Sequence, residues 1–172
     1  RGGDSLMGRY FLYRMHPFTV AEVVCQDLPD PEKIIHPPQK INENDFSALW
    51  IHGGYPEPFI KRDMRFSRRW HNLRQHQLLR EDIRDLTQIH QLDQLEILVN
   101  ILMTRSSQQL IYSNLATEVQ ISVDTVRRWI NTLCNLHLGV MIRPWFKNVS
   151  RSLRKEPKWF LRDWALIDDP GD

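Results

Sequence analysis

The stretch YSNLATEVQISVDTVRRWINTL, residues 112–133, constrains the fold of this chain more than any other. Its apolar residues recur at helical spacing on both sides of a short break, which is the pattern of a helix-turn-helix. We expect a first helix over Tyr112–Val119 and a second helix that begins after Ser122 as its N-cap. The turn of such motifs usually contains a glycine, and Gln120 stands there instead. The residues expected to face inward are Leu115, Ala116, Val119, Ile121, Val126, Trp129, Ile130 and Leu133.

Two short apolar segments follow this motif and are typical of strands: GVMIRPW at residues 139–145 and KWFLR at residues 158–162. The polar, basic span 146–157 lies between them, so a hairpin is predicted. A helix-turn-helix followed directly by a basic hairpin predicts a winged helix. The chain is therefore expected to be mainly α with a small β component, a helical bundle followed by a winged helix-turn-helix domain.

The first half of the chain is predicted to be mainly helical. RYFLYRMH, residues 9–16, alternates polar and apolar residues like a strand, and Thr19 with Glu22 has the spacing of a capping box for a short helix. Residues 27–43 contain four prolines and are expected to form a linker. Helices are then predicted over residues 45–51, ended by Gly53-Gly54, over 59–88 with one break, and over 93–104.

Composition limits the class of protein. Of the 172 residues, 41% are hydrophobic, and no apolar run approaches the ~18 residues that a membrane span needs. Cys25 and Cys134 lie far apart in sequence, which favours reduced thiols in a cytoplasmic protein. The sequence contains no GxxxxGK[ST] loop, no histidine pair with a third metal ligand nearby and no nucleophile motif. We therefore predict no catalytic residue, no metal site and no enzymatic activity for this chain.

Positive charge gathers around the predicted hairpin. Residues 138–164 hold seven basic and two acidic residues, whereas the whole chain has a net charge of only +2. Such clustering favours a nucleic-acid partner, and double-stranded DNA is the candidate. The excess charge lies in the hairpin, where it would meet phosphate, whereas the second helix offers only Arg127 and Arg128 for base edges and also carries Asp124, which repels phosphate. We therefore expect non-specific binding in the first instance. The candidate contacts are Thr125, Arg127, Arg128 and Asn131 on the second helix, for the major groove, and Lys147, Arg151, Arg154 and Lys155 in the hairpin, for phosphate.

Two alternatives to these assignments stay open. The second helix could present a solvated face within a domain that contacts other protein. A second basic strip, IKRDMRFSRRWHNLR at residues 60–74, could bind phosphate, but an exposed helix face opposite its apolar residues is the favoured interpretation.

Several segments occur in an order that resembles a known family. They are GDSLMGRYFLYRMHPFTVAEV, ALWIHGGYPEPF, LLREDIRDL and PKWFLRDWAL, with the helix-turn-helix before the last. The order and spacing are similar to those of prokaryotic AAA-type (AAA+) ATPases with a C-terminal winged helix and nuclease-like domain. In this comparison Asp163 matches a family aspartate, but Trp164 replaces the small residue that usually follows it, so different packing is expected there.

The resemblance implies a division of the chain. Residues 1–26 would end the ATPase core, residues 27–104 would form a helical lid-like region, residues 105–164 the winged helix, and residues 165–172 the start of the following segment. ATP and magnesium would belong to the parent protein, with no cofactor held by this chain. Arg9 matches the family's glycine-arginine position, which implies a nucleotide-binding role.

The resulting expectation is a fragment of an AAA-type ATPase without a P-loop. Its winged helix would couple nucleotide state to a partner, either DNA or the rest of the parent ATPase. The alternatives are a free-standing winged-helix DNA-binding regulator and a protein-contact adaptor. Since the strand over residues 9–16 would lack its sheet neighbours, self-association is also expected.

Overall fold

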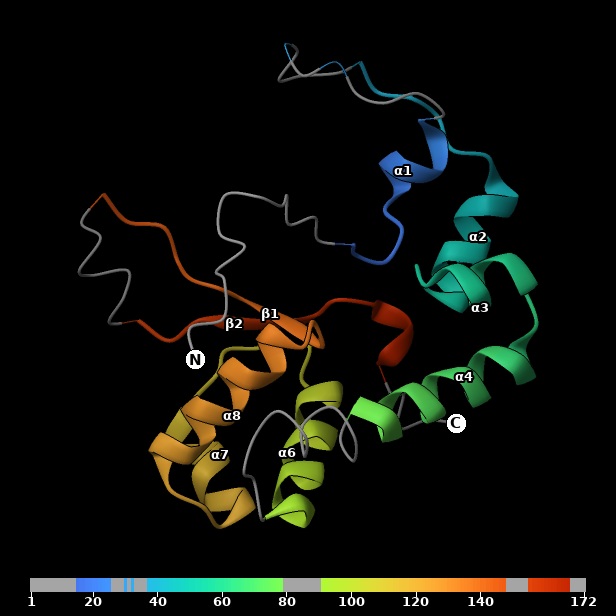
Figure 1. The fold of residues 1–172 in the computed structure, drawn as a ribbon. Helices are drawn as coiled ribbons and strands as arrows, with labels where there is room; N and C mark the ends of the chain where they lie inside the picture. The colour runs from blue at the N-terminus through green and yellow to red at the C-terminus, as the bar shows by residue number, and fades with distance from the viewer. Residues whose placement is uncertain are drawn as a thin grey trace, which may run out of the picture.

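The computed structural model describes residues 15–25, 30, 32, 37–78, 91–147 and 155–167 (Figure 1). The prediction of a mainly α fold with a small β component is confirmed. No helix of this described part is long and apolar enough to cross a membrane. The elements are α1 (Val20–Val24), α2 (Glu43–His52), α3 (Pro56–Lys61), α4 (Met64–Gln77), α6 (Leu92–Thr104), α7 (Tyr112–Val119), α8 (Val123–Asn135), β1 (Gly139–Ile142), β2 (Lys158–Leu161) and the short 3-10 helix η2 (Trp164–Leu166).

Most of the predicted helices are present with the expected signals. The capping box of α1 forms, since Thr19 accepts from the backbone of Glu22 and the Glu22 side chain accepts from Thr19. The helical stretch predicted over residues 59–88 with one break corresponds to α3 and α4, and the break lies where Arg62 adopts a left-handed conformation and Asp63 caps α4. Residues 79–88 of that prediction lie outside the described residues, as do residues 9–14 of the predicted first strand.

The main core lies between α6, α7, α8 and the hairpin. Trp159 of β2 is fully buried in it, and its indole nitrogen donates to the carbonyl of Leu102, 3.1 Å away. Gly139 lies against this ring, where an added Cβ would come within 2.3 Å. Of the residues predicted to face inward in the helix-turn-helix, Ile121 is half-buried. All the others are buried, namely Leu115, Ala116, Val119, Val126, Trp129, Ile130 and Leu133.

The hairpin is antiparallel, with Gly139 opposite Leu161 and Ile142 opposite Lys158. β1 is shorter than predicted and ends two residues before Pro144, which has no N–H for a sheet hydrogen bond. The linker between α6 and α7 lies along the other edge of β2. There Trp159 N–H donates to the Gln108 carbonyl at 2.9 Å and Leu110 N–H donates to the Pro157 carbonyl at 2.8 Å. Both edges of β2 are therefore paired.

A buried carboxylate joins the first helices to the end of the hairpin. Asp163 follows β2 and is fully buried. Its two oxygens accept hydrogen bonds from the N–H of Gly54 and the N–H of Ala165, each at 3.1 Å. Burial raises the pKa of this carboxyl above its ordinary value, and the backbone N–H groups around it oppose the rise. The neighbouring Trp164 indole donates to the Leu49 carbonyl at 2.9 Å, at the end of α2.

The glycine pair after α2 is required by this junction. Gly53 has φ 80° and ψ −177°, a conformation that is essentially restricted to glycine. A Cβ at Gly53 would lie 2.5 Å from both Asp163 carboxylate oxygens, and one at Gly54 would lie 2.6 Å from the Phe18 carbonyl. Phe18 N–H donates back to the Gly54 carbonyl at 2.6 Å. Three segments distant in sequence therefore meet at Gly53-Gly54.

We expect Gly53→Ala to lower the free energy of unfolding by about 2–4 kcal/mol, because it combines backbone strain with a contact on the buried carboxylate. Urea unfolding followed by circular dichroism measures the change. Ser47→Ala, at an exposed position of α2, is the control and should change stability by less than about 0.5 kcal/mol. Equal stability of the Gly53 and Ser47 variants would contradict this account of the junction.

A buried histidine cluster holds α2 against α4. His52 Nδ1 lies 2.8 Å from Ser67 Oγ, and the Ser67 hydroxyl donates to the Asp63 carbonyl at 2.9 Å. His71 is also buried, and its Nε2 has no hydrogen-bond partner among the described residues. Burial lowers the pKa of both histidines, and His52 lowers the pKa of His71 further. The packing between these helices therefore favours neutral imidazoles.

This cluster should make the fold less stable in mild acid. As pH falls through the unfolded-state histidine value near 6.5, the unfolded chain takes up protons that the folded cluster resists. The free energy of unfolding then falls by at most about 1.4 kcal/mol per pH unit for each histidine. We expect His71→Leu to reduce the loss of stability between about pH 7.5 and about pH 5.5, measured by urea unfolding at each pH.

The control for this measurement is His76→Gln, at an exposed position of the same helix. Its loss of stability on acidification should equal that of the unchanged chain. The raised pKa of Asp163 has the opposite effect on stability: the folded state takes up this proton at a higher pH than the unfolded state, so acidification stabilises the fold at this group. That contribution is common to all three proteins and cancels in the comparison. An unchanged pH dependence in the His71 variant would contradict the prediction.

Candidate nucleic-acid interface

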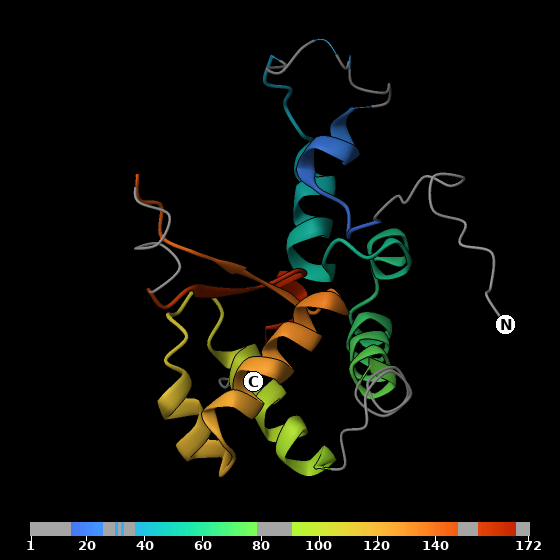
Figure 2. The ribbon, with the colours of Figure 1, turned by 60° about the vertical axis from the view of Figure 1, so that its left-hand side comes forward.

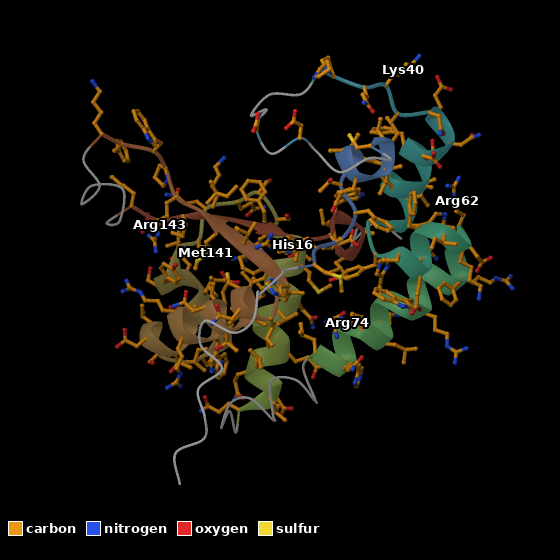
Figure 3. All side chains as sticks on the ribbon, turned by 45° about the horizontal axis from the view of Figure 1, so that its top comes forward. His16, Lys40, Arg62, Arg74, Met141 and Arg143 are labelled. Atoms are coloured by element: carbon orange, nitrogen blue, oxygen red, sulfur yellow. The ribbon has the colours of Figure 1, made fainter. Side chains whose placement is uncertain are left out.

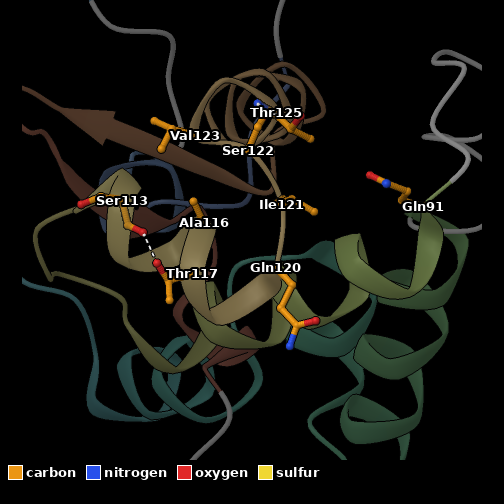
Figure 4. A pocket seen from close by; sticks show the side chains of 9 residues that line it. All are labelled: Gln91, Ser113, Ala116, Thr117, Gln120, Ile121, Ser122, Val123 and Thr125. Carbon is orange, nitrogen blue, oxygen red and sulfur yellow. Dashed lines mark hydrogen bonds between the residues drawn. The ribbon is translucent and has the colours of Figure 1, made fainter.

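The turn of the helix-turn-helix forms without the expected glycine. Gln120 adopts the left-handed conformation with φ 59° and ψ 45°, and Ile121 N–H donates to the Ala116 carbonyl at 3.0 Å (Figure 4). Ser122 then caps α8, as predicted, since its hydroxyl oxygen accepts from Thr125 N–H at 3.1 Å. The motif therefore keeps the tight bend at the expense of a strained, non-glycine residue.

We expect Gln120→Gly to raise the free energy of unfolding by about 1 kcal/mol, because glycine adopts this conformation without strain from a Cβ. Thermal or urea unfolding measures the gain. Gln120→Ala separates the backbone effect from loss of the side chain, since alanine keeps the Cβ and should give no gain. If both variants stabilise the chain equally, strain at the turn is not the reason.

A shallow groove of about 730 Å³ follows the turn between α7 and α8 (Figure 4). Its lining is rich in hydroxyl groups, namely Ser113, Thr117, Ser122 and Thr125. Thr125 is one of the predicted DNA contacts, but its Oγ1 lies 2.8 Å from Ser122 Oγ and takes part in the helix cap. This hydroxyl is therefore less available for a base than the sequence indicated.

A second cleft, of about 320 Å³, separates α8 from the hairpin. Its basic side chains come from three segments: Arg127 from α8, Arg143 from the arm after β1, and Lys155 from the arm before β2. Asn131 of α8 also faces it. Figure 3 labels Arg143 and Met141 on the hairpin side of the molecule. The cleft brings together positive charges that lie 28 residues apart in sequence at their extremes.

Tyr112 lines this cleft beside Arg127. The Arg127 guanidinium carbon lies 5.1 Å from the centroid of the Tyr112 ring, a cation–π arrangement. The phenol hydroxyl lies 3.6 Å from the Met141 sulfur and donates to it. Burial raises the pKa of Tyr112, while the positive charges of Arg143 and Arg127 oppose the rise. The phenol is therefore protonated at neutral pH and remains a hydrogen-bond donor.

The balance of charge in the cleft favours an anion. Its one carboxylate, Glu156, accepts a hydrogen bond from the Gln109 amide at 3.3 Å. Arginine and lysine are the side chains that most often contact nucleic-acid phosphate, and hydroxyl groups such as that of Ser113 also do so. The geometry can therefore hold a phosphate group between α8 and the hairpin.

Three of the predicted contacts, Arg127, Asn131 and Lys155, line this cleft. Arg128 and Lys147 are exposed but line neither the cleft nor the groove. The predicted contacts Arg151 and Arg154, and the predicted nucleotide-binding Arg9, lie outside the described residues.

Tyr112 and Arg143 were missing from the predicted interface. Tyr112 begins α7 and was predicted as part of a helix, with no sign that its ring would lie beneath an arginine of α8. Arg143 follows the apolar residues of a predicted strand. The one sequence signal that this strand ends before Arg143 is Pro144, since proline restricts the residue before it.

The second basic strip has a different setting. Arg62 forms an ion pair with Asp45 of α2. Its charge is therefore partly neutralised within the chain, and it does not extend a continuous phosphate-binding surface. Arg65 and Arg69 are exposed on α4. In two views of the ribbon, α4 lies on the opposite side of the molecule from the hairpin (Figures 1 and 2). The two basic surfaces are therefore separate.

Comparison with known proteins gives one family and two relatives. Residues 43–168 match the family described as "Domain of unknown function (DUF8612)". "Uncharacterized protein Rv2008c" of Mycobacterium tuberculosis and "Uncharacterized protein Mb2031c" of Mycobacterium bovis are each 25% identical over 164 residues. These residues cover 95% of this chain and 33% of each relative, so the chain spans about a third of their length. No solved structure matches the chain significantly.

Proposed function

The chain belongs to the DUF8612 family, and we propose that it supplies a winged helix that binds double-stranded DNA without strong sequence preference. We further propose that it does so as the lid and winged-helix part of an AAA-type ATPase. In this role it couples the nucleotide state of the ATPase to the DNA.

The order of the elements supports the winged-helix assignment. A helix-turn-helix, α7 and α8, is followed directly by an antiparallel hairpin, β1 and β2. The linker before α7 pairs with the free edge of β2, and α6 closes the core behind the motif. The hairpin is thus fixed beside α8, where a wing would reach the DNA backbone.

The observation that carries the proposal is the convergence of Arg127, Arg143 and Lys155 on one cleft. Cations held by separate elements around a protonated phenol suit a phosphate rather than a neutral ligand. A backbone contact of this kind gives affinity without sequence information, with a dissociation constant of roughly 10⁻⁴–10⁻⁶ M at physiological salt.

The junction at Asp163 supports the coupling role. Asp163 and Trp164 follow the second strand of the hairpin and are hydrogen-bonded to Gly54 and Leu49 at the end of α2. A displacement of α2 in response to nucleotide would therefore be transmitted to the hairpin through buried contacts. The relatives are about three times as long as this chain, which leaves room for an ATPase core in a protein of that length.

A protein-contact adaptor is the second candidate. Phe46 and Trp50 lie one turn apart on α2, with nearly parallel rings whose centroids are 6.5 Å apart. They are 49% and 68% exposed. Exposed aromatic pairs are typical of protein interfaces, so this face favours a protein partner on the side of α2. DNA at the hairpin and a protein at α2 are compatible.

We expect the double variant Arg143→Ala/Lys155→Ala to weaken binding to all duplexes about equally. It should also reduce the slope of log affinity against log salt by about one for each phosphate contact removed. Titration of labelled duplexes of different sequence at several salt concentrations measures both effects. Arg65→Ala/Arg69→Ala removes the same charge from α4 and is the matched control. Its affinity for duplexes and its salt slope should both be close to those of the unchanged chain.

The outcome distinguishes the candidate functions. If the unchanged chain retards no duplex, DNA is not the partner and the adaptor role is favoured. If the α4 variant loses affinity and the hairpin variant does not, the DNA-binding surface is α4 and the cleft assignment is wrong.

A further inference from the structure

A single side chain, Tyr112, links the helix-turn-helix to the hairpin at the cleft. It is the first residue of α7, and the Arg127 guanidinium carbon of α8 lies 5.1 Å from its ring centroid. Its hydroxyl donates to the sulfur of Met141 in β1 at 3.6 Å. Met141 is paired across the hairpin with the fully buried Trp159. Tyr112 therefore contacts both elements that form the walls of the cleft.

The ring and the hydroxyl of Tyr112 have different partners, so their contributions can be separated by substitution. The bond to Met141 is expected to be weak, because a thioether sulfur is a poor hydrogen-bond acceptor. The contact with Arg127 is expected to be the stronger one, because a full positive charge lies over the π face of the ring. The ring is therefore the part of Tyr112 that can influence ligand binding.

The ring restricts an arginine that would otherwise be free to move. Arg127 is exposed, and an exposed arginine side chain has many accessible rotamers. Fixing such a side chain on a ligand costs conformational entropy, and part of that cost is removed if a ring already holds the guanidinium. An aromatic ring carries no net charge, so it holds the cation without neutralising it as a carboxylate would. Arg127 is therefore ordered and still fully charged.

We propose that Tyr112 is the positioning residue of this cleft, and that its ring holds Arg127 so that Arg127 and Lys155 bind one phosphate group between them. Arg127 lines the cleft from α8, and Lys155 lines it from the arm of the hairpin. The inference rests on the proposed DNA binding and names the residue that orders its phosphate contact. It also distinguishes Arg127 from its neighbour Arg128, which does not line the cleft.

The test is a double-mutant cycle on the binding of the 172-residue chain to a labelled duplex. Tyr112→Leu removes the ring and should weaken binding by about two- to fivefold, the effect of a cation–π contact at an exposed site. In an Arg127→Ala background the same substitution should have no further effect, because the cation that the ring holds is gone. Tyr112→Phe keeps the ring and should restore most of the affinity that Tyr112→Leu loses.

The salt dependence and a neighbouring arginine separate positioning from packing. Arg127→Ala should lower the salt slope by about one, because it removes a phosphate contact, whereas Tyr112→Leu should leave the slope unchanged. The matched control is the same cycle with Arg128→Ala. In that background Tyr112→Leu should weaken binding by the same factor as in the unchanged chain.

The NMR signals of the Arg127 side chain give a check that does not depend on the folding of Tyr112→Leu. The ring current of Tyr112 should shift these signals upfield in the free chain, and they should stay shifted when the duplex is bound. Signals that return to their ordinary positions on binding would show that Arg127 leaves the ring, which would overturn the proposal.

The proposal is also overturned if the losses of affinity from Tyr112→Leu and Arg127→Ala add in the double variant, since the two residues then act independently. An equal loss for Tyr112→Phe and Tyr112→Leu would assign the effect to the hydroxyl and overturn it as well. Failure of the proposed function is a different result, in which the unchanged chain binds no duplex and both proposals fall. If the unchanged chain binds and only the coupling is absent, the DNA binding stands and the role of Tyr112 is wrong.

Discussion

The buried Asp163 carboxylate is the interaction that joins α2 to the hairpin among the described residues. A carboxylate without water is tolerated only where hydrogen bonds replace its hydration, and here backbone N–H groups of Gly54 and Ala165 do so. The Gly54 group can approach it because Gly53 has no side chain and adopts a conformation restricted to glycine, whereas the Ala165 bond is a local cap. The position of α2 relative to the hairpin is therefore set by one acid and two glycines.

This junction adds to the contacts that hold the hairpin, and with it the cleft between α8 and the hairpin, in a fixed position. β2 is paired on one edge with β1 and on the other with the linker before α7, and Trp159 fixes its centre in the core. The Asp163 contacts then fix its end. Arg143 and Lys155 lie on the described arms of the hairpin, which extend from a sheet that is held by these contacts on both edges and at its end. If the cleft binds phosphate as we propose, a site built on such a base would require little ordering when the ligand arrives, which would lower the entropic cost of binding.

The local parts of the fold could be predicted from the sequence, and the long-range parts could not. The bounds of α7 and α8 follow from apolar periodicity and from the Ser122 cap, which are properties of neighbouring residues. The break at Arg62 depends on a left-handed residue that no local rule demands. The cleft depends on pairing between distant segments, which places Tyr112 and Arg143 beside Arg127. Periodicity contains no information on such contacts, so both residues were missed.

The side chains of α8 explain why weak sequence preference is the expected mode of DNA binding. Four residues were candidates for reading bases, but the Thr125 hydroxyl takes part in the helix cap and the Arg127 guanidinium lies over the Tyr112 ring. Arg128 and Asn131 remain as exposed groups that could reach base edges. Asp124, in the first turn of the helix, repels the phosphates that flank the groove. In the DNA binding that we propose, recognition would therefore depend mainly on the phosphate charge that the hairpin meets, and only secondarily on the bases that α8 faces.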